Sequence, residues 1–176
     1  MNGAEEAFWQ WRAAISPYFD SVPLVDPRRS AAPPPTCVQY TLGDTLLIDT
    51  TFPRQVFLRD ARWRRQHDDA DHLLVQVFLR GGNIVCCGDT EYIERPGGVF
   101  AVNLGYETTG VSTDAEVLTL VLPRPWLASA AEGLVDVRGH LFTPDGSAER
   151  LLADYMVSLR REAATARRES APAMAE

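Results

Sequence analysis

The 176-residue sequence lacks the features that mark membrane and secreted proteins. It has no run of roughly 18 apolar residues, so no stretch is long enough to cross a membrane as a helix. The N-terminus has no basic region followed by an apolar segment, which a secretory signal would need. Hydrophobic residues make up 45% of the chain and charged residues 23%, as in ordinary globular proteins. We therefore expect a cytoplasmic protein that folds as one structural domain.

Cysteine is scarce, with only three in the chain: Cys37, Cys86 and Cys87. Cys86 and Cys87 are adjacent on an expected strand, so their side chains point to opposite faces and are poorly placed to bridge each other. Cys37 could pair with one of them. We expect three reduced thiols that act as small core residues.

Net positive charge is also lacking, since the formal charge is −7 and the pI is about 5.0. A module that binds duplex DNA is usually basic, because it replaces counterions on the phosphates. Arginines gather at 59–65 and at 160–168, but acidic residues lie within or beside both clusters. We expect that this chain alone does not bind DNA specifically.

The stretch 71–103 carries the strongest structural signal. Its first part, about 71–80, is an apolar run in which Gln76 is the only polar interior residue. Side chains alternate along a strand, so one face holds Leu73, Val75, Val77 and Leu79, and the other holds Leu74, Gln76 and Phe78. A strand that is apolar on both faces is covered on both faces.

Tight turns follow this strand at short intervals. Gly81-Gly82 and Gly88-Asp89 suit two-residue hairpins, because glycine reaches positive φ without a clash. Pro96-Gly97 fits the centre of a type II turn. The turns separate expected strands at 83–87, 90–94 and 99–102. Strands this short and this close predict an antiparallel sandwich or a small barrel.

The flanking segments divide the chain into three parts. Residues 1–35 contain an amphipathic helix at 4–16, which ends near Pro17, and a proline-rich arm at 26–35. Residues 36–122 contain the strands: beyond those above, we expect 36–42, 45–51, 54–60 and 115–122, with a loop and short strand at 104–112 and a solvated loop at 62–71. Residues 123–176 contain expected helices at 123–131 and 147–168, joined by a link at 139–143.

This order resembles the cupin-type sensor domain of AraC-type transcription regulators over roughly residues 5–165. The resemblance rests on Leu79-Arg80-Gly81 before a glycine hairpin, the Pro96-Gly97 turn, and Leu122-Pro123-Arg124 leading into Trp126-Leu127. A long helix that carries Tyr155 follows. Gly98 departs from the pattern, because an aspartate commonly completes that turn. The resemblance implies a mainly β fold, a cupin-like double-stranded β-helix (jelly-roll) barrel with an N-terminal helix and a C-terminal helical segment.

The resemblance also implies a function. In that family the domain senses a small molecule and dimerises, and a helix-turn-helix pair that follows it reads DNA. These 176 residues leave no room for that pair, so we expect either a fragment of a longer regulator or a sensor that works alone. A stand-alone cupin-like binding or interaction protein, or a small cupin enzyme, are the alternatives.

Candidate site residues follow from the barrel. Aromatic and polar side chains on its strands are the candidates for contacting a small effector: Tyr40, Phe57, Gln76, Phe78, Tyr92 and Phe100. Gln76 would orient the ligand or satisfy neighbouring backbone groups. The apolar stripe of the last helix is the candidate homodimer contact: Leu152, Tyr155, Met156 and Leu159.

We expect no metal, no cofactor and no enzymatic activity. His67 and His72 lie near several aspartates, but metal-binding cupins carry a His-x-His pair followed by a carboxylate and a later histidine. This chain has no His-x-His, and His140 is its only other histidine. The sequence also shows no nucleophile–base pair and no phosphate-binding glycine loop.

Overall fold

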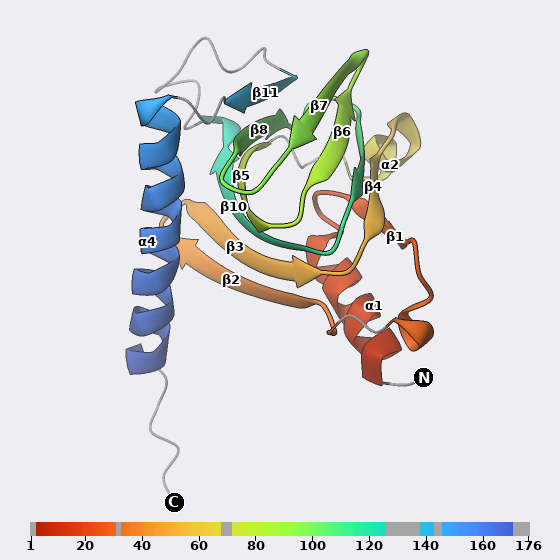
Figure 1. Ribbon diagram of the computed structural model, residues 1–176, viewed down its shortest axis with the longest axis horizontal. Helices are drawn as coiled ribbons and strands as arrows, with labels where there is room; N and C mark the ends of the chain where they lie inside the picture. The colour runs from red at the N-terminus through yellow and green to blue at the C-terminus, as the bar shows by residue number, and fades with distance from the viewer. Residues whose placement is uncertain (1–2, 31–32, 68–71, 126–137, 143–145, 171–176) are drawn as a thin grey trace, which may run out of the picture.

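The computed structural model describes residues 3–30, 33–67, 72–125, 138–142 and 146–170. Among them, two antiparallel sheets face each other and form a flattened barrel (Figure 1). The six-stranded sheet has the order β11 (Gly139–Phe142), β8 (Val99–Asn103), β5 (His72–Arg80), β10 (Ala115–Pro123), β3 (Thr45–Phe52) and β2 (Thr36–Leu42). The five-stranded sheet has the order β1 (Asp20–Pro23), β4 (Gln55–Arg59), β9 (Thr108–Ser112), β6 (Asn83–Cys87) and β7 (Thr90–Glu94).

This architecture confirms the mainly β, cupin-like jelly roll expected from the sequence. The predicted strands at 36–42, 83–87 and 90–94 have the observed bounds. The turn at Pro96-Gly97 is also confirmed: the amide of Gly98 donates to the carbonyl of Arg95 at 3.0 Å, and Gly97 has a φ of +80°. A side chain at that φ would be strained, which explains the glycine.

Three helices lie around the barrel in the described part of the chain: α1 (Gly3–Ile15), α2 (Ala61–Gln66) and α4 (Ser147–Ser170). A short 3-10 turn, η1 (Pro27–Arg29), begins the proline-rich arm. Figure 1 shows α4 (blue) along one side of the barrel and α1 (red) on the opposite side. No helix among the described residues is long and apolar enough to span a membrane. Cys37, Cys86 and Cys87 are all free thiols.

Three local predictions need correction. The stretch expected as a solvated loop at 62–71 begins instead with α2, whose Trp63 is buried. Its helix starts because the Asp60 carboxylate accepts from the amide of Trp63 at 2.7 Å. The expected link at 139–143 contains β11, which pairs with β8. The expected hairpin at Gly81-Gly82 is a turn that leads from one sheet to the other, because β5 and β6 belong to different sheets. Strand β1 was not predicted; it pairs with β4. The expected helix at 123–131 lies mostly outside the described residues.

The six-stranded sheet is apolar on both faces, as the β5 pattern predicts. Its outer face carries a buried cluster that includes Val75, Val77 and Leu118. Helix α4 covers part of this face with Met156, which is 0% exposed, and with the half-buried Leu152. The inner face carries a second cluster around Leu74 and Phe100.

The five-stranded sheet differs, because it carries an aliphatic row on its outer face and a polar row on its inner face. One cross-strand row on its outer face consists of aliphatic β-branched residues, paired in register from β1 to β7: Val22, Val56, Val111, Ile84 and Ile93. Four of these five are exposed, and Val56 is partly buried. A second row lies on the inner face and is polar. It runs in register across β4, β9, β6 and β7: Gln55, Ser112, Asn83 and Glu94.

Candidate ligand-binding cavity

A cavity of about 60 Å³ lies between the two sheets. Most of its wall is apolar, with aromatic rings contributed by α1, the segment after it and both sheets: Trp11, Tyr18, Phe19, Phe52, Phe57, Phe78 and Phe100. The polar side chains in the wall are uncharged: Thr50, Gln76, Asn83, Thr108 and Thr119. A site for one water needs on the order of 10–15 Å³, so the cavity can hold a small organic molecule or several waters.

The alternation of β5 and β10 brings Gln76 into this cavity. Gln76 pairs with Thr119 across the two strands, and its amide nitrogen donates to the Thr119 hydroxyl at 3.2 Å. Gln76 therefore has a side-chain partner on the neighbouring strand. The pair places a small polar spot on an otherwise apolar wall.

Four of the six predicted ligand contacts line the cavity: Phe57, Gln76, Phe78 and Phe100. Tyr40 does not, because the phase of β2 turns its side chain to the outer face, where it packs against the cluster under α4. Tyr92 is also absent from the wall. It packs against Phe100, with 5.2 Å between ring centroids, and its hydroxyl donates to the carbonyl of Gly139 at 2.8 Å.

Two residues of the cavity wall that have an unpaired polar side-chain atom, Trp11 and Asn83, were not predicted from the sequence. Trp11 is 3% exposed and packs against Phe52 and Phe57, with centroid distances of 5.5 and 6.2 Å. Its helical spacing indicated a buried face but not that the face closes a cavity. Asn83 shares the inward face of β6 with Val85 and Cys87, and this alternation was the signal that could have identified it.

Several polar atoms of the inner face have no hydrogen-bond partner among the described residues. Two of these atoms belong to residues of the cavity wall, Asn83 Oδ1 and, from α1, Trp11 Nε1. The other two belong to neighbouring residues, Gln55 Nε2 and Glu94 Oε2, and all four atoms are fully buried. Buried polar groups are usually paired, because an unpaired one loses its hydrogen bonds to water without replacement. These unpaired atoms therefore cost stability in the part of the fold that surrounds the cavity.

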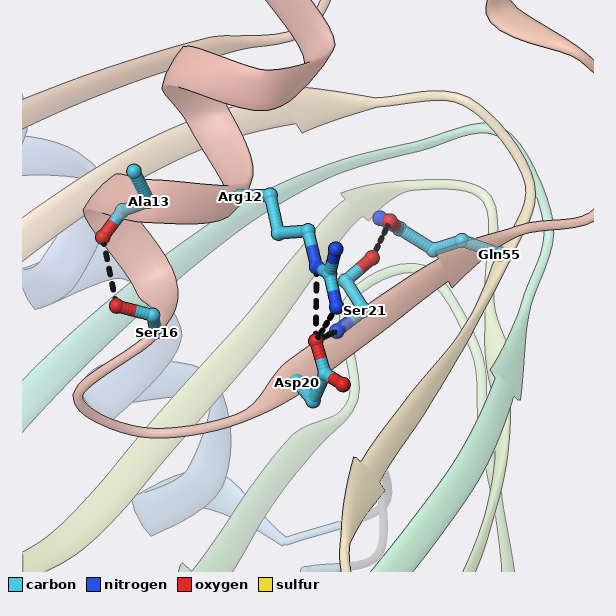
Figure 2. A network of polar contacts seen from close by, with 6 residues as sticks. All are labelled: Arg12, Ala13, Ser16, Asp20, Ser21 and Gln55. Carbon is cyan, nitrogen blue, oxygen red and sulfur yellow. Dashed lines mark hydrogen bonds and ion pairs between the residues drawn. The ribbon is translucent and has the colours of Figure 1, made fainter. Parts of the chain in front are cut away.

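Side-chain hydrogen bonds are made at both ends of the polar row, at Gln55 and at Glu94. Figure 2 shows the Ser21 hydroxyl pointing at Gln55, to whose side-chain oxygen it donates. Asp20, next to Ser21, accepts from Arg12 Nε of α1 at 2.8 Å, which ties the helix to β1. At the other end, Asn83 Nδ2 donates to Glu94 Oε1 at 3.4 Å.

Glu94 is the carboxyl group of this row and is 3% exposed. Burial disfavours its charged form and raises its pKa to about 8, although the hydrogen bond from Asn83 opposes the shift. The group therefore holds its proton in most molecules at neutral pH. The wall in front of it is lined by uncharged groups.

The outer face of the six-stranded sheet connects the barrel to α4 through one arginine. Arg160 Nε lies 2.7 Å from Asp49 Oδ2 of β3, and its Nη1 lies 3.0 Å from Glu116 Oε1 of β10. Partial burial raises the pKa of Asp49, and Arg160 counteracts this shift. One side chain of α4 thus holds carboxylates of two adjacent strands.

The four predicted dimer residues lie in different environments. Met156 is fully buried on its own barrel, and Leu152 and Leu159 pack partly against the same cluster. Tyr155 is 58% exposed, and Leu151 is 69% exposed. The stripe is therefore divided between an inner part that covers the barrel and an exposed part.

No group of three histidine, cysteine, aspartate or glutamate side chains within the described ranges is arranged to hold a metal ion.

Comparison with solved structures finds a similar fold in a transcription regulator. The AraC-like transcriptional activator CuxR superposes with a TM-score of 0.79 and 26% sequence identity over 89% of this chain. The resemblance to the cupin-like domain of AraC-type regulators is confirmed. The match covers 57% of the CuxR chain, so this chain spans somewhat more than half of that protein.

Two further matches are more distant. A cupin superfamily protein from Desulfitobacterium hafniense DCB-2 is 10% identical, with a TM-score of 0.41 over 57% of this chain and 87% of that one. A cupin-2 domain protein from Rhodospirillum rubrum is 15% identical, with a TM-score of 0.36 over 66% of this chain and 84% of that one. No protein-family model and no curated protein sequence matches the chain.

Proposed function

We propose that this chain is the effector-binding domain of an AraC-type transcription regulator, and that a small molecule binds in the cavity between the sheets. The observation that carries the proposal is the cavity itself, in a fold that superposes on an AraC-like activator. Its aromatic wall with a few uncharged polar groups is the usual composition of a small-molecule site.

A regulatory role accounts for the wall better than a catalytic one. None of the described residues that line the cavity is a carboxylate, a histidine or a cysteine. General acid–base and nucleophilic catalysis depend mostly on such groups. We therefore propose that the chain binds its ligand without transforming it.

The contacts of Arg160 supply a route from the cavity to α4. Thr50 of β3 and Val117 of β10 line the cavity. Asp49 and Glu116, which are next to them on the same strands, hold Arg160 on the outer face. A ligand that shifts β3 against β10 would change the geometry of both ion pairs, and α4 would respond.

DNA would be contacted by a helix-turn-helix segment of the regulator and not by the elements described above. Strands separate α1, α2 and α4 from one another, so these helices form no such pair. We also propose a homodimer in which the exposed part of α4, with Leu151 and Tyr155, contacts a second copy. Light scattering should then show that Tyr155→Glu is a folded monomer, whereas Val157→Glu, an exposed position elsewhere on α4, remains a dimer. A monomeric wild type at micromolar concentration would contradict the dimer.

The effector proposal is tested by thermal-shift screening of a metabolite library, with two variants from adjacent positions of β6. Val85 lines the cavity, and Ile84 faces outward. Hits should lose their stabilising effect in Val85→Phe, which fills the cavity, and keep it in Ile84→Phe. A library without hits, or hits that are unaffected by Val85→Phe, would overturn the proposal.

A further inference from the structure

We propose that the outer face of the five-stranded sheet binds an amphipathic helix of another protein. The helix lies across the strands, with its apolar side on the aliphatic row of that face. Its basic residues lie next to Glu91, and its acidic residues lie next to Arg54 and Arg95. This surface is on the outside of the barrel, and the inference does not depend on the effector site.

The aliphatic row is a continuous apolar surface that faces water. It crosses all five strands in register, and its four exposed members are between 43% and 50% exposed: Val22, Val111, Ile84 and Ile93. Antiparallel sheets with one face in water usually carry polar side chains there. Single exposed aliphatic residues are common, but a contiguous patch of them marks an interaction site. We therefore infer that a partner covers the row.

The row is a stripe only one residue wide. Glu91 and Arg95 lie two residues to either side of Ile93 along the same strand, and both are exposed. Two residues of a strand span about 6.8 Å, so charged groups border the stripe closely. A second sheet packed flat on this face would bury these charges, which is unfavourable. A helix, which is roughly 10–12 Å across, covers the stripe and leaves the charges at its edges.

The spacing of the row also suits a helix that crosses the strands. Neighbouring strands lie about 4.8 Å apart, and a helix rises about 5.4 Å per turn. Helix residues at i, i+4, i+7 and i+11 therefore meet successive strands. The other sheet already has this arrangement. Helix α4 contacts β8, β10 and β3, whose order in the sheet is β8-β5-β10-β3, so it crosses the strands over an apolar outer face.

The charges beside the row specify the sides of the partner helix. Arg54 and Arg95 lie along one side of the row, and Glu91 lies along the other. None of these three side chains forms an ion pair or a hydrogen bond with another described residue. A helix with acidic residues on one flank and basic residues on the other complements both sides. Such complementarity contributes mainly to specificity and to the rate of association.

The test uses a synthetic helical peptide of about 18 residues, long enough to form a helix in isolation. It carries leucines at i, i+4, i+7 and i+11, lysines along one flank and glutamates along the other. Binding is measured by two-dimensional NMR of the wild-type chain at physiological salt. We expect the peptide to shift resonances of β6, β7 and β9 and to leave those of α4 unchanged.

Two variants test the apolar contact. The double change Ile84→Thr and Val111→Thr should weaken binding of the peptide at least about tenfold. Val157→Thr replaces an exposed aliphatic residue of α4 and is the control, so it should bind as wild type. The positions are exposed, and the shifts in the wild type remain a separate measurement if a variant does not fold.

A second pair of variants tests the charges. Arg54→Glu with Arg95→Glu makes both sides of the row acidic. This variant should bind the peptide about tenfold less tightly and should prefer a peptide with lysines on both flanks, whereas wild type prefers the mixed peptide. Arg150→Glu with Arg161→Glu makes the same change of net charge on exposed positions of α4 and should keep the wild-type preference.

Several outcomes would overturn the proposal. These are the absence of binding, shifts confined to other surfaces, binding that the two threonines leave unchanged, and a preference that does not follow the charges at Arg54 and Arg95. Binding of the wild type to phosphatidylcholine vesicles, lost in the threonine variant, would identify a membrane as the occupant instead. Self-association that the threonine variant abolishes would identify a second copy of the chain.

Discussion

The two sheets enclose the same cavity but are built differently. The six-stranded sheet is apolar inside and outside, and α4 packs on its outer face through Met156. The five-stranded sheet carries a polar row inside and an exposed aliphatic row outside. Only the first has a described helix packed over its outer aliphatic side chains.

This difference separates stability from recognition. The six-stranded sheet supplies most of the buried apolar side chains and connects to α4 through Arg160. The five-stranded sheet holds unpaired polar atoms near the cavity, in Gln55, Asn83 and Glu94. Unpaired buried groups cost stability, and sites that bind ligands commonly bear such costs.

The largest effect is expected in the core beneath α4. Leu118 is 0% exposed on the outer face of β10, so Leu118→Ala should lower the free energy of unfolding by about 2–5 kcal/mol. Urea titration followed by circular dichroism measures this. A loss below about 1 kcal/mol would mean that α4 does not cover this face in solution.

Glu94→Gln is expected to remove a cost that the polar row imposes at high pH. A glutamate carboxyl ordinarily has a pKa of 4.5, whereas Glu94 has a pKa of about 8 in the native protein. Between these values the unfolded chain releases a proton that the native protein keeps. Wild-type stability should therefore fall as pH rises through this window, with the cost fully present above pH 8.

The glutamine variant cannot titrate, so its stability should change less with pH. At pH 8 we expect it to be more stable than wild type by roughly 1–4 kcal/mol, and at pH 4 the two should be similar. Urea titrations at a series of pH values measure the difference. Glu91→Gln, at an exposed position of the same strand, is the control. Parallel pH profiles for Glu94→Gln and wild type would show that Glu94 is solvated.

A smaller effect is expected where α4 meets the strands. Arg160→Gln removes both ion pairs and leaves Asp49 and Glu116 unneutralised on adjacent strands. The Arg160 side chain is 34% exposed, so solvent screens the pairs, and the loss of stability should be about 1 kcal/mol. Hydrogen exchange should be faster in α4. Arg161→Gln, whose ion pair with Glu162 is largely exposed, should change neither quantity.

Most of the fold could be predicted from the sequence, because its turns and strand pattern are local. Glycine at positive φ marks the hairpins after β2 and β6 and the turn after β5, which leads to the other sheet. The alternation of β5 gave both of its faces. The failures occur where an element is short and depends on long-range pairing. Strand β11 is four residues long, too short for periodicity, and forms by pairing with β8.

The candidate site was predicted less well than the fold. Phase along a strand tells which side chains share a face, but not which face points inward. This is why Tyr40 was grouped with Phe57, although the two lie on opposite sides of the barrel wall. Asn83 and Glu94 matter because register places them side by side on β6 and β7, and register is a tertiary property.

The smallest effect is expected on the outer face of the five-stranded sheet. Ile84 and Val111 are paired in register there, and they are 47% and 50% exposed. The double change Ile84→Thr and Val111→Thr keeps β-branched side chains and exchanges methyl groups for hydroxyls that water can reach. Each substitution should change the free energy of unfolding by no more than about 0.5 kcal/mol, and the mass in solution should stay the same. Urea titration and light scattering on the same samples measure both. If the double variant loses several kcal/mol or changes its oligomeric state, the row is covered by another surface, and both sheets then have covered outer faces. If it does not, cover by α4 remains the property that distinguishes the six-stranded sheet.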